Sequence, residues 1–481
     1  MMASTSATET EERVTLPARW GRRWASEPGA ATFVTSDRRG AWLDAGEVDE
    51  STRAVAANLA SRGVGLGDRV GWQADATSEA LLVALGALRL GAVLVPLSAS
   101  QSQLERSNVL SEVEPVIVVS AAGSKGGDCD PAELLAPGSS DVALDGVATD
   151  DLAVIVFTSG TTGHPKGVML THGNLASQVD SLAEAWGWTS GDRLVSALPL
   201  FHVHGLIVAV LASLSVGASV AIEPSFDAGT FASRADELSA TMTFCVPTML
   251  HRIAAAGQIE PLRHLRLVVS GSAPLSRELF DAFGSEGVPI LERYGMTETL
   301  LTISNPLEGE RRAGSVGFAL PGVELDLPKP DGAEAELRVA GPTVFAGYWR
   351  RPNATAEVLD DGWVRTGDVV SVDEDGFIRI CGRQKDLIIT GGFNVYPTEV
   401  EDVLTRDPAI REAGVVGVAS PEWGEEVVAF VVAAGGSVDA RAAVDRQSML
   451  LSSYKRPRRI IMVDELPRNA MGKLQRHLLR P

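Results

Sequence analysis

The sequence is poor in the residues that form disulfides and zinc sites. Its 481 residues include three cysteines, Cys129, Cys245 and Cys381, which lie far apart and form no Cys-x-x-Cys pair. The seven histidines show no zinc-like pairing with the cysteines. This usage argues against a disulfide framework and a zinc site, and it predicts reduced thiols in a cytoplasmic protein.

Long apolar runs are also missing. No uncharged apolar run reaches the length of about 18 residues that suggests a membrane-spanning helix. The nearest candidate, residues 206–216, is too short and predicts a buried helix. The first 13 residues are rich in Ser, Thr and Glu and have no apolar centre, so they do not resemble a signal peptide. We therefore expect no membrane span.

Positive charge is scarce as well. The chain has 42 Lys and Arg against 62 Asp and Glu, a formal net charge of −20. Such a balance argues against nucleic acid and anionic membranes as partners. It does not exclude an anionic small molecule, because a local basic pocket can override the global sign. The sequence carries no signal for the oligomeric state.

The length and the order of apolar segments predict an α/β fold of roughly two to four domains or subdomains. Short apolar runs alternate with helical segments up to about residue 292, a pattern typical of parallel βαβ units. Short strands with Asp-Gly turns follow over residues 323–380. We expect a large N-terminal domain, residues 1–384, made of βαβ subdomains and a β-rich subdomain. A small mobile α+β domain, residues 385–481, is expected after it.

One loop has the composition of a phosphate site. The segment Thr158-Ser159-Gly160-Thr161-Thr162-Gly163-His164-Pro165-Lys166-Gly167 follows an apolar run that predicts a buried strand. Glycines let backbone N–H groups turn toward an anion, and hydroxyls and a lysine add donors and charge. We expect a strand, this loop and then a helix that begins near Asn174.

The loop is not a Walker A motif. That pattern requires a second glycine where this chain has Pro165, and a Ser or Thr where it has Gly167. A P-loop NTPase is therefore disfavoured.

Four further segments come after the loop. They are Leu198-Pro199-Leu200-Phe201-His202-Val203-His204-Gly205, Glu292-Arg293-Tyr294-Gly295-Met296-Thr297-Glu298-Thr299, Thr366-Gly367-Asp368 and Pro467-Arg468-Asn469-Ala470-Met471-Gly472-Lys473. In this order, the five segments resemble the adenylate-forming superfamily of acyl-CoA synthetases, nonribosomal adenylation domains and luciferases. The resemblance implies that a carboxylate attacks the α-phosphate of ATP, with Mg²⁺ and CoA as cofactor and cosubstrate.

The resemblance also implies residue roles. Lys473 would be the catalytic lysine, assisted by Thr297, and Glu298 would bind the magnesium ion. Asp368 and Arg383 would bind the ribose. The remaining residues expected around ATP or AMP are Thr158, Ser159, Gly160, Thr161, Thr162, Gly163, Lys166, Ser272, Ala273, Pro274, Glu292, Tyr294, Gly295, Met296 and Thr297.

In the superfamily, the C-terminal domain is expected to rotate between two half-reactions. One face would bring Lys473 to the nucleotide for adenylation. The other would bring Gly391, Gly392 and Phe393 for thioester formation with CoA. The pivot would be Lys385, two residues after Arg383.

Arg293 is the residue that bears on which carboxylic acid is the substrate. Many fatty and aromatic acyl-CoA synthetases have a small or uncharged residue before the Tyr-Gly pair. An arginine there can be a fork for a second substrate carboxylate, with His204 and Ser270 as further donors. It can instead be a structural salt bridge to Glu292 or a nearby acid. Residues 201–204 contain no aspartate to bind an amino group, so amino-acid activation is disfavoured.

The strings LPLFHVHGL, VPTMLHRIA, VSGSAPL and ERYGMTETLLTISNP resemble malonyl-CoA synthetases of the MatB type. This resemblance implies malonate as substrate, and methylmalonate as a second one. The alternative is a fatty acyl-CoA or acyl-AMP ligase in which Arg293 is structural. A catalytically silent nucleotide sensor is disfavoured because the lysines, acids and arginine of the motifs are intact, namely Lys166, Glu298, Asp368, Arg383 and Lys473.

Overall fold

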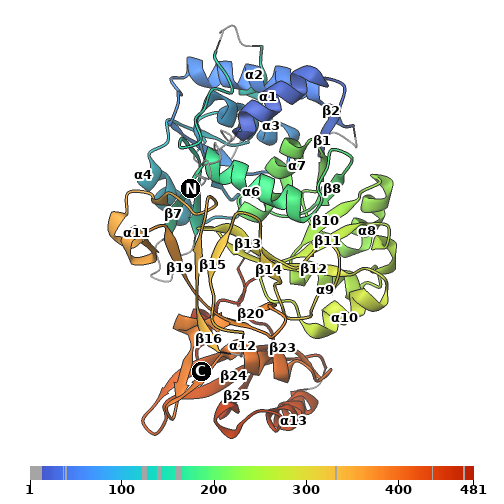
Figure 1. The fold of residues 1–481 in the computed structure, drawn as a ribbon, viewed down its shortest axis with the longest axis vertical. Helices are drawn as coiled ribbons and strands as arrows, with labels where there is room; N and C mark the ends of the chain where they lie inside the picture. Colours follow the sequence, from blue (N-terminus) through green and yellow to red (C-terminus); the bar gives the residue numbers. More distant parts are fainter. Residues whose placement is uncertain are drawn as a thin grey trace, which may run out of the picture. The chain divides into compact units, whose positions relative to one another are not determined.

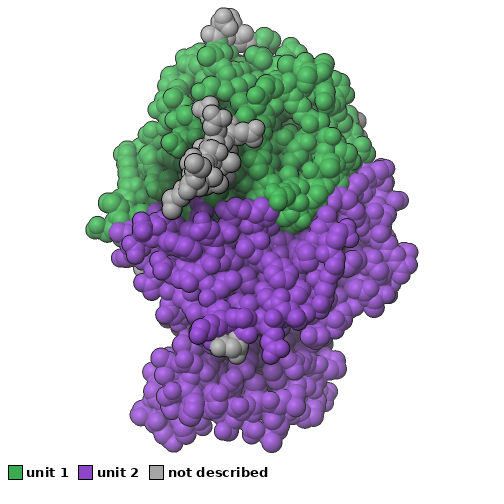
Figure 2. All heavy atoms as spheres, viewed as in Figure 1, with its two compact units in different colours: residues 1–224, 342–355 green, residues 225–341, 356–481 purple. Residues whose placement is uncertain are grey.

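The computed structural model describes residues 14–35, 37, 41–121, 127–137, 142–158, 165–330, 333–435, 437–469 and 472–481. It divides into two compact units, coloured green and purple in Figure 2. Unit 1 comprises Met1–Pro224 and Pro342–Thr355, and unit 2 comprises Ser225–Gly341 and Ala356–Pro481. Each unit mixes helices and sheets, so the expected α/β class is confirmed (Figure 1).

Unit 1 contains two sheets and the helices around them. Its elements are α1 (Leu16–Ser26), β1 (Ala31–Thr35), β2 (Leu43–Asp44), α2 (Ala45–Ser61), β3 (Arg69–Gln73), α3 (Ser78–Leu90), β4 (Val93–Leu97), α4 (Gln103–Val113), β5 (Ile117–Val119), α5 (Pro131–Leu135), β6 (Leu152–Thr158), β7 (Lys166–Thr171), α6 (His172–Ala185), β8 (Arg193–Ser196), η2 (His204–Leu211), α7 (Ala212–Val216), β9 (Ser219–Ile222) and β17 (Gly347–Tyr348). Helix α11 (Pro352–Val358) begins in unit 1 and ends in unit 2.

The first sheet confirms the predicted parallel units. Its strand order is β17-β7-β6-β4-β3-β5, with β3 parallel to both β4 and β5. Helix α3 connects β3 to β4 and has clear end signals. The Thr77 side chain accepts a hydrogen bond from the Ala80 N–H, and Gly91 ends the helix at φ 88°. Nearly every residue of α3 is buried, which fits its apolar sequence. The second sheet of this unit has the order β8-β9-β1-β2.

The segment around the expected phosphate loop differs from the prediction. A second strand, β7, comes after the loop and pairs antiparallel with β6, so that Thr158 lies opposite Lys166. Lys166 therefore begins a strand and does not lie in the loop. The apolar and β-branched residues from Val168 to Thr171 favour a strand, and the helix starts only after them. Helix α6 begins at His172, with Thr171 and Asn174 forming a capping box.

The helix expected over residues 206–216 is also different. The chain forms a π-helix, η2, over His204–Leu211 and continues as α7. All eight residues of η2 are buried. Hydropathy predicts burial but does not distinguish hydrogen bonding at i→i+5 from i→i+4, and π-helices are frequent at functional sites.

Unit 2 contains the elements from α8 onward. They are α8 (Ala228–Glu237), β10 (Met242–Cys245), α9 (Pro247–Ala255), η3 (Glu260–Leu262), β11 (Leu267–Ser270), α10 (Arg277–Ser285), β12 (Ile290–Met296), β13 (Leu300–Ser304), β14 (Phe318–Ala319), β15 (Glu324–Asp326), β16 (Glu334–Ala340), β18 (Leu359–Asp360), β19 (Trp363–Val372), β20 (Ile378–Arg383), η4 (Gln384–Asp386), β21 (Ile388–Thr390), β22 (Phe393–Val395), α12 (Pro397–Leu404), β23 (Ile410–Ser420), β24 (Gly424–Ala433), α13 (Ser437–Ser448), η5 (Ser453–Lys455), β25 (Arg459–Met462) and η6 (Arg476–Leu478).

The strands of unit 2 fall into three groups. Strands β10, β11 and β12 are parallel neighbours, and β13 and β14 continue the same sheet antiparallel. The β-rich region forms the second sheet, in which β19 pairs with β16, β18 and β20. The last sheet has the order β22-β21-β24-β23 with β25 beside β24. Two clusters of buried apolar side chains drawn from residues 388–479 pack against this last sheet.

One negative finding concerns membranes. Within the residues that the structure describes, no helix is both long and apolar enough to cross a bilayer.

Candidate active site

Asp368 is the centre of a buried polar group in unit 2. Strands β19 and β20 are joined by a turn at residues 373–377, and the resulting register places Asp368 opposite Arg383. The Arg383 Nε donates to Asp368 Oδ1 at 2.8 Å, and the Tyr294 hydroxyl donates to Asp368 Oδ2 at 2.6 Å. The Thr366 hydroxyl accepts from the Asp368 N–H at 3.1 Å. The structure thus joins three residues that the sequence predicted around the ribose and adenine.

The charges of this group are set by their neighbours. Burial lowers the pKa of Arg383, but the Asp368 carboxylate outweighs burial, so that the pKa is raised overall. Burial and the Asp368 charge raise the pKa of Tyr294 well above its ordinary value. Tyr294 is therefore a neutral hydrogen-bond donor to Asp368.

The hairpin of β12 and β13 carries the predicted acid for magnesium. Strand β12 ends at Met296, and the tight turn Thr297-Glu298-Thr299 leads into β13. Glu298 is buried, whereas Thr297, Gly295 and Met296 are partly exposed. No group of three or more His, Cys, Asp or Glu side chains suited to a metal was found in the described ranges. A magnesium ion held by Glu298 would therefore need phosphate or water oxygens to complete its shell.

Glu292 holds the predicted adenine turn by a hydrogen bond. The Leu275 N–H, just after Ser272-Ala273-Pro274, donates to Glu292 Oε1 at 3.1 Å. Burial raises the pKa of Glu292 to about 8, so the carboxyl is mostly protonated at neutral pH. Ser272 has φ 73°, in the left-handed region that favours glycine. Glu292 is thus a buried support of the turn.

Arg293 lies on the opposite face of β12 from Glu292, because successive strand residues alternate. No ion pair joins Arg293 to an acid in the described ranges, and its buried Nε has no hydrogen-bond partner. The salt bridge considered as the structural explanation of this residue is therefore not observed. Burial lowers the pKa of Arg293 to about 9, which leaves the guanidinium charged at neutral pH.

Gly271 makes room for this guanidinium. It comes directly after β11 and beside Arg293, and a Cβ atom at position 271 would lie 2.4 Å from Arg293 Cζ. Real Cβ atoms do not approach carbon atoms so closely. The arginine can therefore lie flat across the neighbouring strand end only because residue 271 has no side chain.

The other two predicted acid-binding residues belong to different elements. The β11–β12 register pairs Ser270 with Glu292, and paired residues point to the same face. Ser270 is thus on the face opposite Arg293. His204 begins η2 in unit 1 and is buried.

The segment of residues 467–473, which we call the lysine loop, presents Lys473. The Asn469 Oδ1 accepts from the Lys473 N–H at 2.9 Å, and the Asn469 N–H donates to the Lys473 carbonyl at 3.0 Å. Arg468 donates to the Gly472 carbonyl at 2.6 Å and pairs with Glu412 at 2.7 Å. Ala470 and Met471 lie outside the described residues.

The Lys473 ammonium lies in the electrostatic field of the Asp368 group. Its side chain keeps access to solvent, yet the surrounding protein displaces enough water to lower its pKa to about 8. Arg383 and Lys385 lower the pKa further, whereas Asp368 and Asp386 oppose them. The predicted catalytic lysine thus interacts electrostatically with the predicted ribose acid within unit 2.

The residues predicted for the hinge and for CoA lie after β20. Lys385 is in η4, and burial followed by the Arg383 charge lowers its pKa. Gly391 and Gly392 form the turn between β21 and β22 with φ 57° and 81°. Phe393 is 55 % exposed and stacks on Tyr454 with ring centroids 4.6 Å apart.

Unit 1 contains the ends of the predicted phosphate loop. Thr158 ends β6 and Lys166 begins β7, and the Lys166 Nζ lies 4.8 Å from the Tyr348 ring centroid. The intervening predicted residues, Ser159, Gly160, Thr161, Thr162 and Gly163, lie outside the described residues.

Several supporting residues were missed from the sequence. The N–H and side chain of Asn469 and the side chain of Thr366 hold motif residues in place, and their position inside the motifs was the available signal. Tyr348 beside Lys166 had no such signal, because the two are distant in sequence. The contact of Gly271 with Arg293 depends on strand register, which the sequence does not state.

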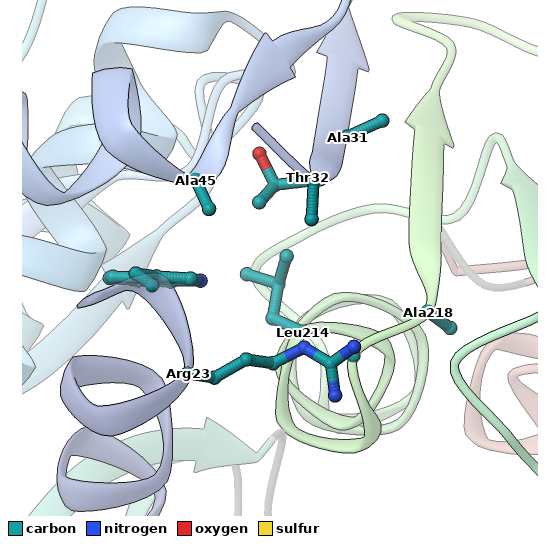
Figure 3. A pocket seen from close by; sticks show the side chains of 9 residues that line it. Arg23, Ala31, Thr32, Ala45, Leu214 and Ala218 are labelled. Atoms are coloured by element: carbon teal, nitrogen blue, oxygen red, sulfur yellow. The ribbon is translucent and has the colours of Figure 1, made fainter. Parts of the chain in front are cut away.

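A small cavity in unit 1 contains none of the predicted site residues. Figure 3 shows it between Arg23 of α1, Thr32 of β1, Ala45 of α2 and Leu214 of α7. Its volume of about 10 Å³ fits no more than a water molecule. It is too small for a nucleotide or an acid substrate.

Comparison with known proteins identifies relatives along most of the chain. The family described as AMP-binding enzyme matches residues 21–349, and the AMP-binding enzyme C-terminal domain matches residues 399–473. A feruloyl-CoA synthase of Amycolatopsis sp is 33 % identical and covers 95 % of this chain and 96 % of that protein. A malonate–CoA ligase of Arabidopsis thaliana is 34 % identical and covers 86 % and 78 %. The crystal structure of ATP-bound MatB from Rhodopseudomonas palustris is 36 % identical, with a TM-score of 0.89 over 96 % of this chain and 98 % of that chain.

Proposed function

The chain belongs to the AMP-binding enzyme family of AMP-forming acid–CoA ligases, and we propose that its acid is malonate, with methylmalonate as a second substrate. In the first step, a malonate carboxylate oxygen attacks the α-phosphorus of ATP and pyrophosphate leaves. In the second step, the CoA thiolate attacks the acyl carbonyl carbon and AMP leaves. The products are malonyl-CoA, AMP and pyrophosphate.

The observation that carries this proposal is the buried guanidinium of Arg293, whose Nε has no hydrogen-bond partner and which forms no ion pair within the described residues. A buried charge without a partner is costly, and an alkyl tail packed against it would leave it unpaired. A carboxylate on the far end of the acid would supply the missing partner with two parallel hydrogen bonds. The likeness to a malonate–CoA ligase and to MatB supports the same acid class.

The residues near Asp368 fit the nucleotide. The Asp368 carboxylate would accept the ribose hydroxyls, with Arg383 and Tyr294 fixing its orientation. The turn of Ser272, Ala273 and Pro274 would line the adenine, and Glu292 supports it. Thr158, Lys166 and the loop between them would bind the phosphates. When bound, a magnesium ion at Glu298 would neutralise phosphate charge.

Lys473 would stabilise the charge that develops between the acid and the α-phosphate. An ammonium with a pKa near 8 remains largely protonated at neutral pH and can donate to both oxygens. For the second step, we propose that residues 385–481 rotate about Lys385 and bring Gly391, Gly392 and Phe393 to the CoA thiol. One domain would then serve two steps by a hinge motion.

A substrate panel tests the acid. Pyrophosphate release is measured with ATP, CoA and malonate, methylmalonate, succinate, acetate, octanoate or palmitate. Malonate and methylmalonate are expected to exceed acetate by about 10³-fold in kcat/KM, because acetate leaves Arg293 unpaired. Higher activity with octanoate or palmitate would establish the monocarboxylic alternative. No release with any acid would favour a silent nucleotide-binding protein.

A further inference from the structure

Among the described residues of the lysine loop, Gly472 contacts a helix of unit 2 that lies far from the loop in sequence. Gly472 packs against Thr248, in the first turn of α9. A Cβ atom at position 472 would lie 2.9 Å from Thr248 Cγ2, 3.0 Å from its Oγ1 and 3.5 Å from its Cβ. The Gly472 backbone is therefore in direct contact with this side chain, with no space for a larger residue.

The lysine loop also forms hydrogen bonds and an ion pair within the segment 385–481. Asn469 caps the Lys473 N–H, and Arg468 ties the Gly472 carbonyl to Glu412 on β23. These contacts all lie after residue 385 and would move together with the loop. Thr248 comes from a helix far earlier in the chain. It is thus the contact that depends on where the loop is placed.

We propose that Thr248 is the docking seat of the lysine loop during adenylation, and that Gly472 is a glycine because a side chain there would keep the loop from reaching this seat. The inference rests on the proposed two-step reaction, in which Lys473 serves only the first step. In this proposal Thr248 acts through the lysine loop, so it is a positioning residue. The contact must open before CoA transfer, because the same domain then presents its other face.

A cross-link tests the contact without any substrate. The separation of 3.5 Å between the Thr248 Cβ and a Cβ at position 472 falls in the range of a disulfide. The variant Thr248→Cys/Gly472→Cys should therefore form an internal disulfide under mild oxidation, seen by mass spectrometry after digestion. Each single cysteine variant is the control for Cys129, Cys245 and Cys381. Failure to cross-link would overturn the proposal.

The cross-linked protein then tests the sequence of events. Oxidised protein should still form the acyl-adenylate in single-turnover assays, but CoA transfer should fall by about 10²-fold or more and return on reduction. Transfer at the rate of the reduced protein would overturn the requirement that the seat must open. The cross-link forms whichever acid is activated, so a failure of the malonate assignment is separately visible in the substrate panel.

Compensating substitutions test the steric argument. Asn tolerates the φ of 73° at position 472 better than other residues do, so Gly472→Asn isolates the collision from backbone strain. We expect acid-dependent ATP–pyrophosphate exchange to fall by about 10²-fold, since a displacement of about 1 Å can cost that much. CoA transfer to preformed acyl-adenylate should be unchanged.

Rescue distinguishes a seat from a general defect. Thr248→Ala removes the two atoms that collide, so Thr248→Ala/Gly472→Asn should recover at least about tenfold of the lost exchange. The matched control is His251→Ala on the exposed face of α9, which should neither impair exchange nor rescue Gly472→Asn. Absence of rescue, or equal rescue by His251→Ala, would overturn the proposal.

Discussion

At the scale of single residues, Arg293 sets function against stability. Its guanidinium is buried beside Gly271 with no acid to pair with in the described ranges. A buried charge of this kind is costly, and a dicarboxylic acid would offset the cost by pairing with it. Removing the charge should therefore damage catalysis and strengthen the fold at once.

Arg293→Met tests this trade-off. We expect kcat/KM for malonate to fall by about 10³-fold, ATP affinity to remain within about twofold, and the melting temperature to rise. Arg293→Lys should recover only part of the activity, because an ammonium lacks the planar fork. Activity and thermal unfolding are measured on both variants. A lower melting temperature for Arg293→Met would mean that the arginine is structural.

Glu292 gives a pH prediction with the opposite sign from most carboxylates. Its pKa is about 8 in the folded chain and near 4.5 when unfolded, so the folded state holds the proton more tightly. Its contribution is complete below about pH 4.5 and is lost as the pH rises through about 8. The loss is on the order of 4 kcal/mol at high pH.

Glu292→Gln removes this dependence, because the amide copies the neutral carboxyl. Thermal unfolding of the two proteins from pH 5 to 9 should diverge, with the glutamine variant gaining relative stability as the pH rises. A constant difference across this range would show that Glu292 is already ionised in the folded protein.

At the scale of elements, the lysine loop depends on its cap. Asn469 satisfies the backbone of Lys473 through both its side chain and its own N–H. Asn469→Ala should loosen the loop at a cost of about 1 kcal/mol. We expect ATP–pyrophosphate exchange to fall about tenfold while CoA transfer is retained. Lys473→Ala gives the reference for complete loss of the lysine. Equal loss in both steps would contradict a local role for the cap.

The elements also show what sequence patterns can predict. The apolar runs of β4 and β9 identify strands well because each is short and bounded by turn signals. The hairpin of β6 and β7 was missed because a loop rich in Gly and Thr does not indicate whether a strand or a helix comes next. The π-helix η2 was missed because its buried sequence is equally apolar on every face.

The site residues that belong to local sequence motifs could be predicted. Tyr294, Asp368 and Arg383 come from three motifs, and the structure joins them by hydrogen bonds. The separation of Ser270 from Arg293 was not predictable, because it depends on whether β11 is paired in one register or the next.

At the scale of the whole molecule, we expect residues 385–481 to form a separate domain. Their sheet and both apolar clusters are built from residues 388–479 alone. We expect a fragment of residues 385–481 to fold by itself and unfold cooperatively in urea. Circular dichroism and denaturant titration test this. A fragment without a cooperative transition would argue against the boundary at residue 385 and against a rigid rotating domain.

Gly271 has a consequence for how this enzyme could diverge from its relatives. The arginine side chain fits because residue 271 is a glycine. Any other residue would place at least a Cβ atom where the guanidinium lies. A substitution of Gly271 by alanine would displace the guanidinium although residue 293 would still be arginine. If Arg293 binds a second carboxylate as proposed, a descendant could in this way lose its recognition of diacids and still carry an intact ERYG string. Sequence comparison of the arginine alone would then assign the wrong acid.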